Sequence, residues 1–405
     1  MLELEPMLSK ERQTKQNQWR NVKEIFLVAT KLGLTSFGGP VAHLGYFHNE
    51  YVRKRKWLDD QAYADLVALC QFLPGPASSQ AGIGIGVIRG GIWGGVAAWI
   101  GFTLPSVLLL ACFASFLSAA NSLDAGWIHG LKIVAVAIVV QAVLSMGQKL
   151  APDRIRATIA MLTAAVCLMW PTAAVQVLVI LLAGAFGCLV WKQSDHSPDS
   201  ELRVPISRTA GLLCLLLFFA LLVLLPILSH IGGPSWISLS DHFYRAGSLV
   251  FGGGHVVLPL LDSELVRAGY LSKEQFLAGY GAAQAVPGPL FTFAGYLGAM
   301  IGGWSGALFA TIAMFLPAFL LVIGTLPFWH TLRKNPRIQG ALRAINAAVV
   351  GILLAALYHP IWTSSIQSSA DFALAGFLFC LLVFWKTPPW IVVIIGALGG
   401  WMLPL

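Results

Sequence analysis

Two short motifs rich in Gly and Pro each occur twice in this chain. The first is Phe37-Gly38-Gly39-Pro40, repeated as Phe251-Gly252-Gly253-Gly254, and the second is Pro74-Gly75-Pro76, repeated as Pro287-Gly288-Pro289. Proline lacks an amide donor and glycine destabilises a helix, so each motif should interrupt one. A helix that begins after such a break has free backbone amides at its N-terminus, and these amides favour anions. The four breaks therefore predict an anion site.

Polar side chains flank these breaks in both copies. They supply hydroxyl, amide and imidazole groups: Gln71, Ser78, Ser79, His255, Gln284 and Thr292. If the four breaks converge, the amides and these side chains would surround a tetrahedral oxyanion. The alternative is that the glycines only let helices pack closely, as small residues do in membrane proteins.

Charged residues near the breaks are the next candidates. Lys31 and Arg245 occupy equivalent positions, six residues before the Phe of the first motif, which is about 9 Å along a helix. Together they could balance a dianion, or each could reach to its membrane interface. Proton coupling needs a buried carboxylate, for which Asp65 and Glu264 are the candidates. Glu264 and its equivalent Glu50 could instead be ordinary charges at helix ends.

The composition places these motifs in a membrane. Hydrophobic residues make up 57% of the 405 residues and charged residues 11%, whereas soluble domains average about 25% charged residues. Several apolar stretches reach the roughly 18 residues of a spanning helix, and barrel strands would alternate instead. The sequence therefore predicts an all-α integral membrane protein.

Charge and cysteine usage exclude several other classes. The net charge is +8, but most Lys and Arg lie in short loops, which is typical of loops facing the cytoplasm rather than of nucleic-acid binding. The N-terminal segment lacks the apolar core of a signal peptide and should stay in the cytoplasm. Six scattered cysteines have neither disulfide nor metal-ligand spacing. With no P-loop either, we expect no metal, no cofactor and no ATP hydrolysis.

Loop charges predict that the interrupted segments are re-entrant hairpins. Residues 21–52 are broken at Gly38-Gly39-Pro40 and carry basic residues at both ends, so both ends should face the cytoplasm. Each arm of about 13 residues reaches about 20 Å, which puts the break deep in the bilayer, where only protein or water can surround it. The next segment, which ends at Arg89, follows the same pattern. If the segments crossed instead, the basic run 53–56 would lie outside.

The remaining apolar stretches predict ordinary spanning helices. They lie near residues 92–118, 130–149, 155–170, 172–191 and 209–230, then near 304–328, 341–358, 370–385 and 389–405. Five crossings separate the two copies, so the repeats should have inverted topology, each with two re-entrant or broken hairpins plus transmembrane helices. The predicted division is a cytoplasmic segment 1–24, a first repeat 25–191, a cytoplasmic linker 192–208, a linking helix and outer loop 209–240, and a second repeat 241–405.

The paired motifs resemble those of the chromate ion transporter family in its two-domain, long-chain form. The resemblance rests on the run ending in Phe37-Gly38-Gly39-Pro40, on Pro74-Gly75-Pro76 with the Ser and Gln after it, and on their second copies. It covers nearly the whole chain. It implies a carrier that exports chromate across the bacterial inner membrane, driven by the proton-motive force, and that confers chromate resistance. Sulfate would be a structural mimic, and a homodimer is a possible assembly. Gly254 departs from the pattern, because the first copy has Pro40 there.

Other function classes remain open at this point. An anion channel would use the same breaks but show neither saturation nor coupling. A carrier of sulfate or another oxyanion would share the architecture. A membrane-embedded enzyme should present a His, Asp and Glu constellation on helix faces, and the sequence has none, so we expect a non-enzyme.

Overall fold

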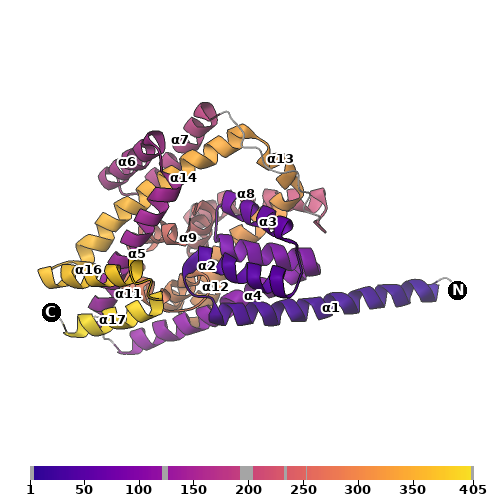
Figure 1. Cartoon of the computed structure of the whole chain (residues 1–405), viewed down its shortest axis with the longest axis horizontal. Coiled ribbons are helices and arrows are strands. Elements are labelled where there is room, and N and C mark those ends of the chain that lie inside the picture. Colours follow the sequence, from indigo (N-terminus) through magenta and orange to yellow (C-terminus); the bar gives the residue numbers. More distant parts are fainter. Residues whose placement is uncertain (1–3, 121–125, 192–203, 232–234, 252, 403–405) are drawn as a thin grey trace.

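A computed structural model describes residues 4–120, 126–191, 204–231, 235–251 and 253–402. The described chain is a succession of helices (Figure 1). They are α1 Leu4–Thr35, α2 Gly39–Phe47, η1 His48–Lys54, α3 Asp60–Phe72, α4 Ala77–Ala120, α5 Gly126–Leu150, α6 Arg154–Met169, α7 Ala173–Val190, α8 Arg208–His230, α9 Ser235–Leu249, η2 Gly254–Val256, α10 Val257–Leu261, η3 Asp262–Val266, α11 Lys273–Ala283, η4 Leu290–Thr292, α12 Phe293–Thr325, η5 Leu326–Phe328, α13 Trp329–Arg333, α14 Pro336–Ala356, η6 Leu357–Trp362, α15 Thr363–Ser365, α16 Ser369–Val383 and α17 Pro389–Met402.

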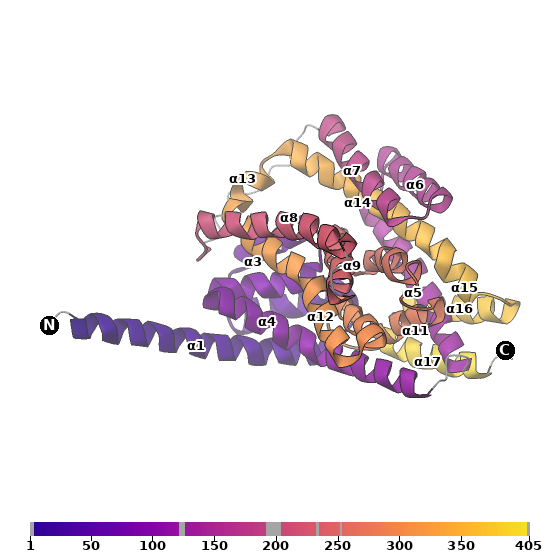
Figure 2. The same ribbon diagram turned by 180° about the vertical axis from the view of Figure 1, so that it is seen from behind.

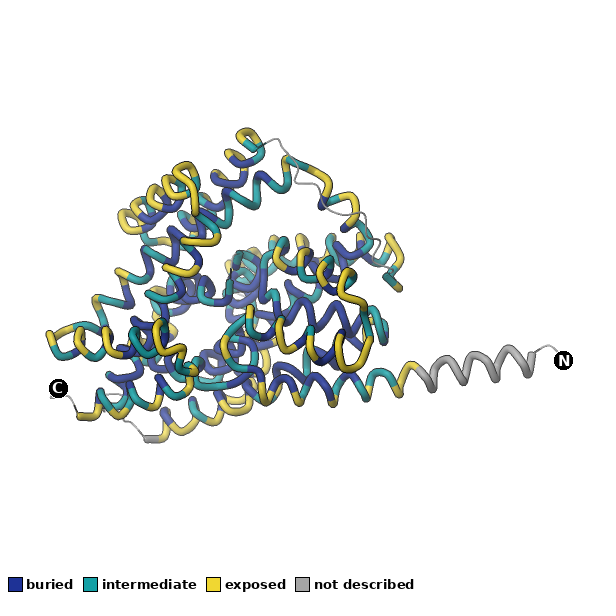
Figure 3. The backbone as a smooth tube through the Cα atoms, viewed as in Figure 1, coloured by how far each residue is buried: buried dark blue, intermediate teal, exposed yellow. Residues whose placement is uncertain are grey.

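The predicted all-α membrane fold is confirmed. Six helical stretches in the described residues are long and apolar enough to cross a membrane, and α16 and α17 are shorter apolar helices. Large apolar side chains lie on the outside, among them Leu181 of α7 and Leu213 of α8, which are each 64% exposed. Figure 3 shows exposed residues along the outward sides of α6, α7 and α17. A surface of this kind requires lipid rather than water.

The predicted spanning helices are found with small differences at their ends. Those over residues 130–149, 155–170, 172–191 and 209–230 are α5 to α8, and those over 341–358, 370–385 and 389–405 are α14, α16 and α17. The helix near 304–328 forms the second part of α12. Capping explains several starts, because Asp153, Thr172 and Ser207 each accept a hydrogen bond from the first turn of their helix.

The helices form two groups, which Figures 1 and 2 show from opposite sides. We call α1–α4 and α8–α12 the hairpin group, and α5–α7, α14, α16 and α17 the scaffold group. Within the scaffold group, α5 packs against α16 and α17, while α14 packs against α6 and α7. Glycines allow these close contacts, since a Cβ on Gly130 would meet the backbone of Gly396 and a Cβ on Gly340 would meet that of Gly187. Helix α5 of the first half therefore packs among helices of the second half, and α14 of the second half packs among helices of the first.

The chain folds back at each of the four predicted breaks, which we call tips 1 to 4. Tip 1 lies around Gly38, tip 2 around Gly75, tip 3 around Gly253 and tip 4 around Gly288, and all four of these glycines have positive φ. Such backbone favours glycine because a Cβ is strained there. The structure thus explains the Gly in every motif by the turn it must make.

The ends of the first two folded segments lie together. The Glu24 carboxylate contacts the guanidinium of Arg55 at 2.8 Å and that of Arg89 at 2.9 Å. The Arg89 guanidinium also lies 4.4 Å from the ring centre of Trp57. These contacts bring both ends of the segment 21–52 to one end of the molecule, as a hairpin requires. Its position relative to the bilayer stays a prediction.

The long helices α4 and α12 are each two antiparallel parts joined at glycine. The non-helical residue in α4 is Gly91, with φ 65 and ψ −161. In α12 the non-helical residues are Gly302 and Gly303, and Gly303 has φ 60 and ψ −151. The parts before and after the turn touch at Gly86 and Gly94 in α4, and at Gly298 and Gly306 in α12. The two repeats therefore share this reversal in the same backbone conformation.

The tips are joined crosswise by backbone hydrogen bonds. The Gly75 amide donates to the Val250 carbonyl at 2.6 Å, and the Gly288 amide donates to the Ser36 carbonyl at 2.8 Å. Tip 2 is thus bonded to tip 3, and tip 4 to tip 1. The amides of Gly75 and Gly288, just before the second arms begin, are therefore bound by the opposite repeat, and the free amides predicted at the starts of those arms stay a prediction.

Candidate functional site

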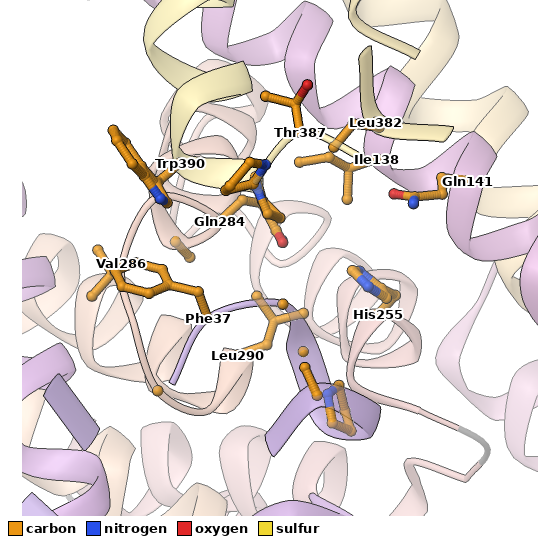
Figure 4. Close-up of a pocket in the computed structure, with 18 of the residues that line it drawn as sticks. Phe37, Ile138, Gln141, His255, Gln284, Val286, Leu290, Leu382, Thr387 and Trp390 are labelled. Atoms are coloured by element: carbon orange, nitrogen blue, oxygen red, sulfur yellow. The ribbon is translucent and has the colours of Figure 1, made fainter. Parts of the chain in front are cut away.

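A cavity of about 580 Å³ lies where tips from both repeats meet the scaffold group. Its lining comes from tip 1, tip 4 and His255, and from Gln141 of α5 with the α16–α17 turn. Figure 4 shows Phe37, Val286 and Trp390 on one side of this space and Gln141 and His255 on the other. A neighbouring cavity of about 270 Å³ shares Gly38, Gly39, Pro40, Gln141 and His255 with it. We treat both as one site.

Tip 1 presents a helix start to this site. Gly38 and Gly39 line the cavity with φ of 95 and 78, and α2 begins at Gly39 with no side-chain cap. The first amides of α2 therefore have no side-chain partner, and the next residue, Pro40, has no amide to satisfy. This is the local geometry that suits an anion.

Donors and cations complete the walls. The Gln284 amide nitrogen is buried without a hydrogen-bond partner, and an unsatisfied buried donor costs free energy that an acceptor in the cavity would recover. The His255 ring is held by a 2.7 Å hydrogen bond between Nδ1 and the Tyr280 hydroxyl. Lys386 lines the larger cavity and Lys149 the smaller one. The site offers donors and positive charge, and no carboxylate lines it among the described residues.

The structure brings many of the predicted site residues to this cavity. Those that line it are Phe37, Gly38, Gly39, Pro40, Gly253, Gly254, His255, Gln284 and Gly288. Residues of three tips are thus assembled from both repeats. Gly252 lies outside the described residues.

Other predicted residues lie away from the cavity. Tip 2 lines neither part of it, nor do Gln71, Ser78, Ser79, Phe251, Pro287, Pro289 and Thr292. Ser78 instead lies 3.3 Å from the His43 ring, and the Thr292 hydroxyl donates to the Pro289 carbonyl at 2.7 Å. Tip 2 is hydrogen-bonded to tip 3 but contributes no lining residue, so three of the four breaks line this cavity.

The two predicted cations are engaged in ion pairs. Lys31 lies 3.7 Å from Glu50, and Arg245 lies 2.9 Å from both Glu264 and Asp241. Neither cation lines the cavity. The arrangement supports a structural role at the hairpins rather than direct contact with a dianion.

The two predicted proton carriers are paired as well. Asp65 contacts Arg333 at 2.9 Å, and Glu264 contacts both Arg245 and the His242 ring, the latter at 2.6 Å. Both carboxylates are therefore held in ion pairs, and neither lines the cavity.

Gln141, Lys149 and Lys386 line the site but were not among the predicted residues. The sequence offers one weak signal for them. Gln141 is a polar side chain in an apolar helix, and Lys386 is the only charged residue between α16 and α17, with a positive φ of 53 that marks a tight turn. Because these three residues are far from the tips in sequence, the sequence does not show that they lie near the tips in the fold.

Comparison with known proteins agrees with the duplicated architecture. A family model described as Chromate transporter matches residues 23–188 and again residues 237–401. The chain is 27% identical to a probable chromate transport protein of Synechococcus elongatus, with 94% of this chain and 95% of the relative covered. It is 28% identical to a chromate transport protein of Pseudomonas aeruginosa, with 94% and 92% covered.

A shorter relative has the length of one repeat. The uncharacterized transporter YwrA of Bacillus subtilis is 31% identical over 168 residues, which are 40% of this chain and 94% of that protein. No solved structure matches the chain at a significant level.

Proposed function

Because the chain belongs to the chromate transporter family, we propose that it carries chromate across the membrane through the cavity at tips 1, 3 and 4. The observation that carries this proposal is the meeting of Gly38, Gly253 and Gly288, from both repeats, around one cavity. The uncapped start of α2, the unpaired Gln284 amide and two lysines supply what a tetrahedral dianion needs. Sulfate has the same shape and charge and should compete.

Transport would proceed by exchange of two positions of the hairpins against the scaffold group. In this proposal the repeats have inverted topology, and the tips hold the anion near the middle of the bilayer. The crosswise bonds from Gly75 to Val250 and from Gly288 to Ser36 join the tips of both repeats. The hairpins can then move as one body while the anion stays bound, so that access alternates between the two sides.

The direction and the energy source belong to the same proposal. Chromate is toxic, so export from the cytoplasm across the inner membrane would confer resistance. A dianion leaving a negative interior is already favoured by the membrane potential, and a proton gradient would add to that force. The ends of the first two hairpins, with Arg55 and Arg89, would face the cytoplasm.

The test is chromate uptake into inside-out membrane vesicles that contain the protein. We expect saturable uptake that increases when the vesicles are energised and that sulfate inhibits. Gln141→Leu should weaken chromate affinity, whereas Gln148→Leu, on the same helix but outside the cavity lining, should not. If the vesicles take up sulfate but not chromate, the protein is still a carrier and its substrate is sulfate rather than chromate. Unsaturable flux that follows the electrochemical gradient alone would identify a channel.

A further inference from the structure

We propose that Asp262 and Gln176 form the proton-binding site of this transporter, an inference that rests on the proposed function. Asp262 opens the π-helix η3 directly after α10 and is 4% exposed, and Gln176 lies in α7 and is 6% exposed. Both line a second cavity, of about 20 Å³, between α7, α10 and α14. This cavity is separate from the anion site described above.

Both side chains present an unpaired acceptor. Asp262 Oδ1 and Gln176 Oε1 are buried and have no hydrogen-bond partner. The nearest cation, Nε of Arg267, lies 3.9 Å from the other carboxylate oxygen of Asp262, which is beyond a hydrogen bond. An ionised carboxylate in this position would be a buried charge without a donor, and such burial is costly.

A proton resolves this situation. A neutral carboxyl group has an O–H donor, which an amide oxygen can accept. Gln176 Oε1 can receive it directly or through one water molecule, for which a cavity of about 20 Å³ has room. The two acceptors are therefore satisfied by one proton.

The surrounding charges favour a proton over a metal ion. Cations such as Ca²⁺ take six or more oxygen ligands, whereas this cavity holds two unpaired side-chain oxygens and is also lined by the cationic Arg267. His359 lines it too, and its ring Nδ1 lies 3.2 Å from the Thr363 hydroxyl. Lys273 of α11 is close enough to act on Asp262 as well. The remaining titratable groups are the buried thiol of Cys167 in the lining and Glu264, which is paired with Arg245 and His242.

The position of Asp262 links its protonation to the anion site. Asp262 follows α10, which packs against α14, and α10 follows Gly253 and His255 at tip 3. A neutral Asp262 stabilises the contact of this hairpin with α7 and α14. A charged Asp262 favours release of the hairpin toward water and Arg267. Release moves tip 3, so the proton and the anion act on opposite ends of one short segment.

The first repeat lacks this site. His48 stands two residues before Glu50, as Asp262 stands two residues before Glu264. His48 contacts Asp60 at 2.7 Å, and the Asp60 side chain is 84% exposed. The position equivalent to Asp262 therefore has no carboxylate in the first repeat, and Asp60 provides an exposed carboxylate for comparison.

The experiment uses the full-length protein in proteoliposomes with an imposed pH gradient and no membrane potential. One coupled proton and a gradient of one pH unit support about tenfold chromate accumulation. Asp262→Asn should lose this accumulation and make the transport rate insensitive to pH, while Asp60→Asn should behave as the wild type. Gradient-driven accumulation by Asp262→Asn equal to that of the wild type would overturn the proposal.

Two further variants test the site without removing the carboxyl group. Gln176→Leu removes the acceptor of the neutral form and should move the pH midpoint of transport downward. Arg267→Gln removes the cation that favours the charged form and should move the midpoint upward, by about one pH unit. Unchanged midpoints, or shifts in one direction, would contradict the proposal even if Asp262→Asn does not fold.

A readout that does not use chromate separates the two proposals. Infrared difference spectra on a pH jump should contain a carboxyl band that disappears in Asp262→Asn and persists in Asp60→Asn. If wild-type protein transports no chromate but the band behaves in this way, the proposed substrate fails and the proton site stands. If chromate is transported and the band persists in Asp262→Asn, the proton site fails alone.

Discussion

The hairpins of the two repeats correspond in sequence but differ in how they contact the scaffold group. In the second repeat, α10 packs against α14 and α11 packs against α5. In the first repeat, α2 and α3 pack mainly on α4 and η1, and neither has a comparable contact with α5 or α14 in the described chain. The large cavity lies beside α2, and the cavity of about 20 Å³ lies beside α10.

The equivalent residues Phe37 and Phe251 show the same difference between the two repeats. Phe37 lines the large cavity. Phe251 packs against the cluster of Cys167, Ile180, Ile352 and Ala355, which joins α6 and α7 to α14. In the proposed mechanism, the first-repeat side is open and the second-repeat side is closed, and the alternate state would exchange these roles. Tips 1 and 3, which are similar in sequence, therefore contact the scaffold group differently within one chain.

Among the changes that test this difference between the repeats, loss of Arg245 should have the largest effect, which is on the free energy of unfolding. Arg245 contacts Asp241 and Glu264, which are 3% and 9% exposed. Arg245→Gln removes the ion pair of buried Asp241 and leaves Glu264 with His242 alone, so it should cost about 3 kcal/mol of unfolding free energy. Lys31 is 61% exposed and lies 3.7 Å from Glu50, so Lys31→Gln should cost less than about 1 kcal/mol. Denaturant unfolding in detergent measures both values.

Equal costs for the two variants would remove the distinction between the ion pairs of the two repeats. Arg53→Gln serves as the control, because Arg53 is exposed at the end of the first hairpin.

A side chain at Gly39 should block transport without preventing insertion. Gly39 has φ 78, and a Cβ there would meet no protein atom within 4 Å, so the side chain would strain the backbone without a clash and would stand in the cavity that Gly39 lines. Left-handed backbone costs an L-residue about 1–2 kcal/mol, and Gly39→Val should lower chromate transport about tenfold or more by moving the start of α2. Gly45→Ala, in the same helix and also in open space, should transport normally. Normal flux in Gly39→Val would exclude tip 1 from the site.

How far the sequence predicts this molecule can be judged from the same residues. The four turns could be predicted because a positive φ favours glycine, which is visible in the sequence itself. The glycines concerned are Gly38, Gly75, Gly253 and Gly288. Helix starts also depend on local residues, since Ser207 caps α8. These local features explain why the all-α fold class and the four turns could be predicted from the sequence pattern.

Contacts between segments far apart in the chain could not be predicted from local sequence in this way. The exchange of α5 and α14 between the repeats depends on pairs such as Gly130 and Gly396, which are separated by most of the chain. Lys31 and Arg245 looked equivalent, but Asp241 adds a second partner in one repeat only. The carboxylates Asp65 and Glu264 were conspicuous in sequence, whereas the isolation of Asp262 exists only in the folded packing.

Thiol labelling should resolve the open and closed sides directly. In a background without the native cysteines, Phe37→Cys should react with a water-soluble maleimide at least about tenfold faster than Phe251→Cys, because reactivity requires access to water. Adding chromate should raise the labelling rate at one of the two positions and lower it at the other. We expect this at low pH and at high pH. Equal rates under all conditions would contradict alternating access, and rates that differ without responding to chromate would indicate a fixed asymmetry.

Removal of Lys386 should have the smallest effect, and it tests which side of the cavity is open. Lys386 is exposed at the rim of the large cavity, beside Thr387 and Trp390. An exposed charge near a dianion contributes about 1 kcal/mol and is screened by salt, so Lys386→Gln should weaken chromate binding about fivefold at low ionic strength and less at high salt. Lys334→Gln, whose side chain lies outside both cavities, is the control. Because the turn carrying Lys386 belongs to the scaffold group, a salt-sensitive loss of affinity would also place that turn beside the bound anion in the open state.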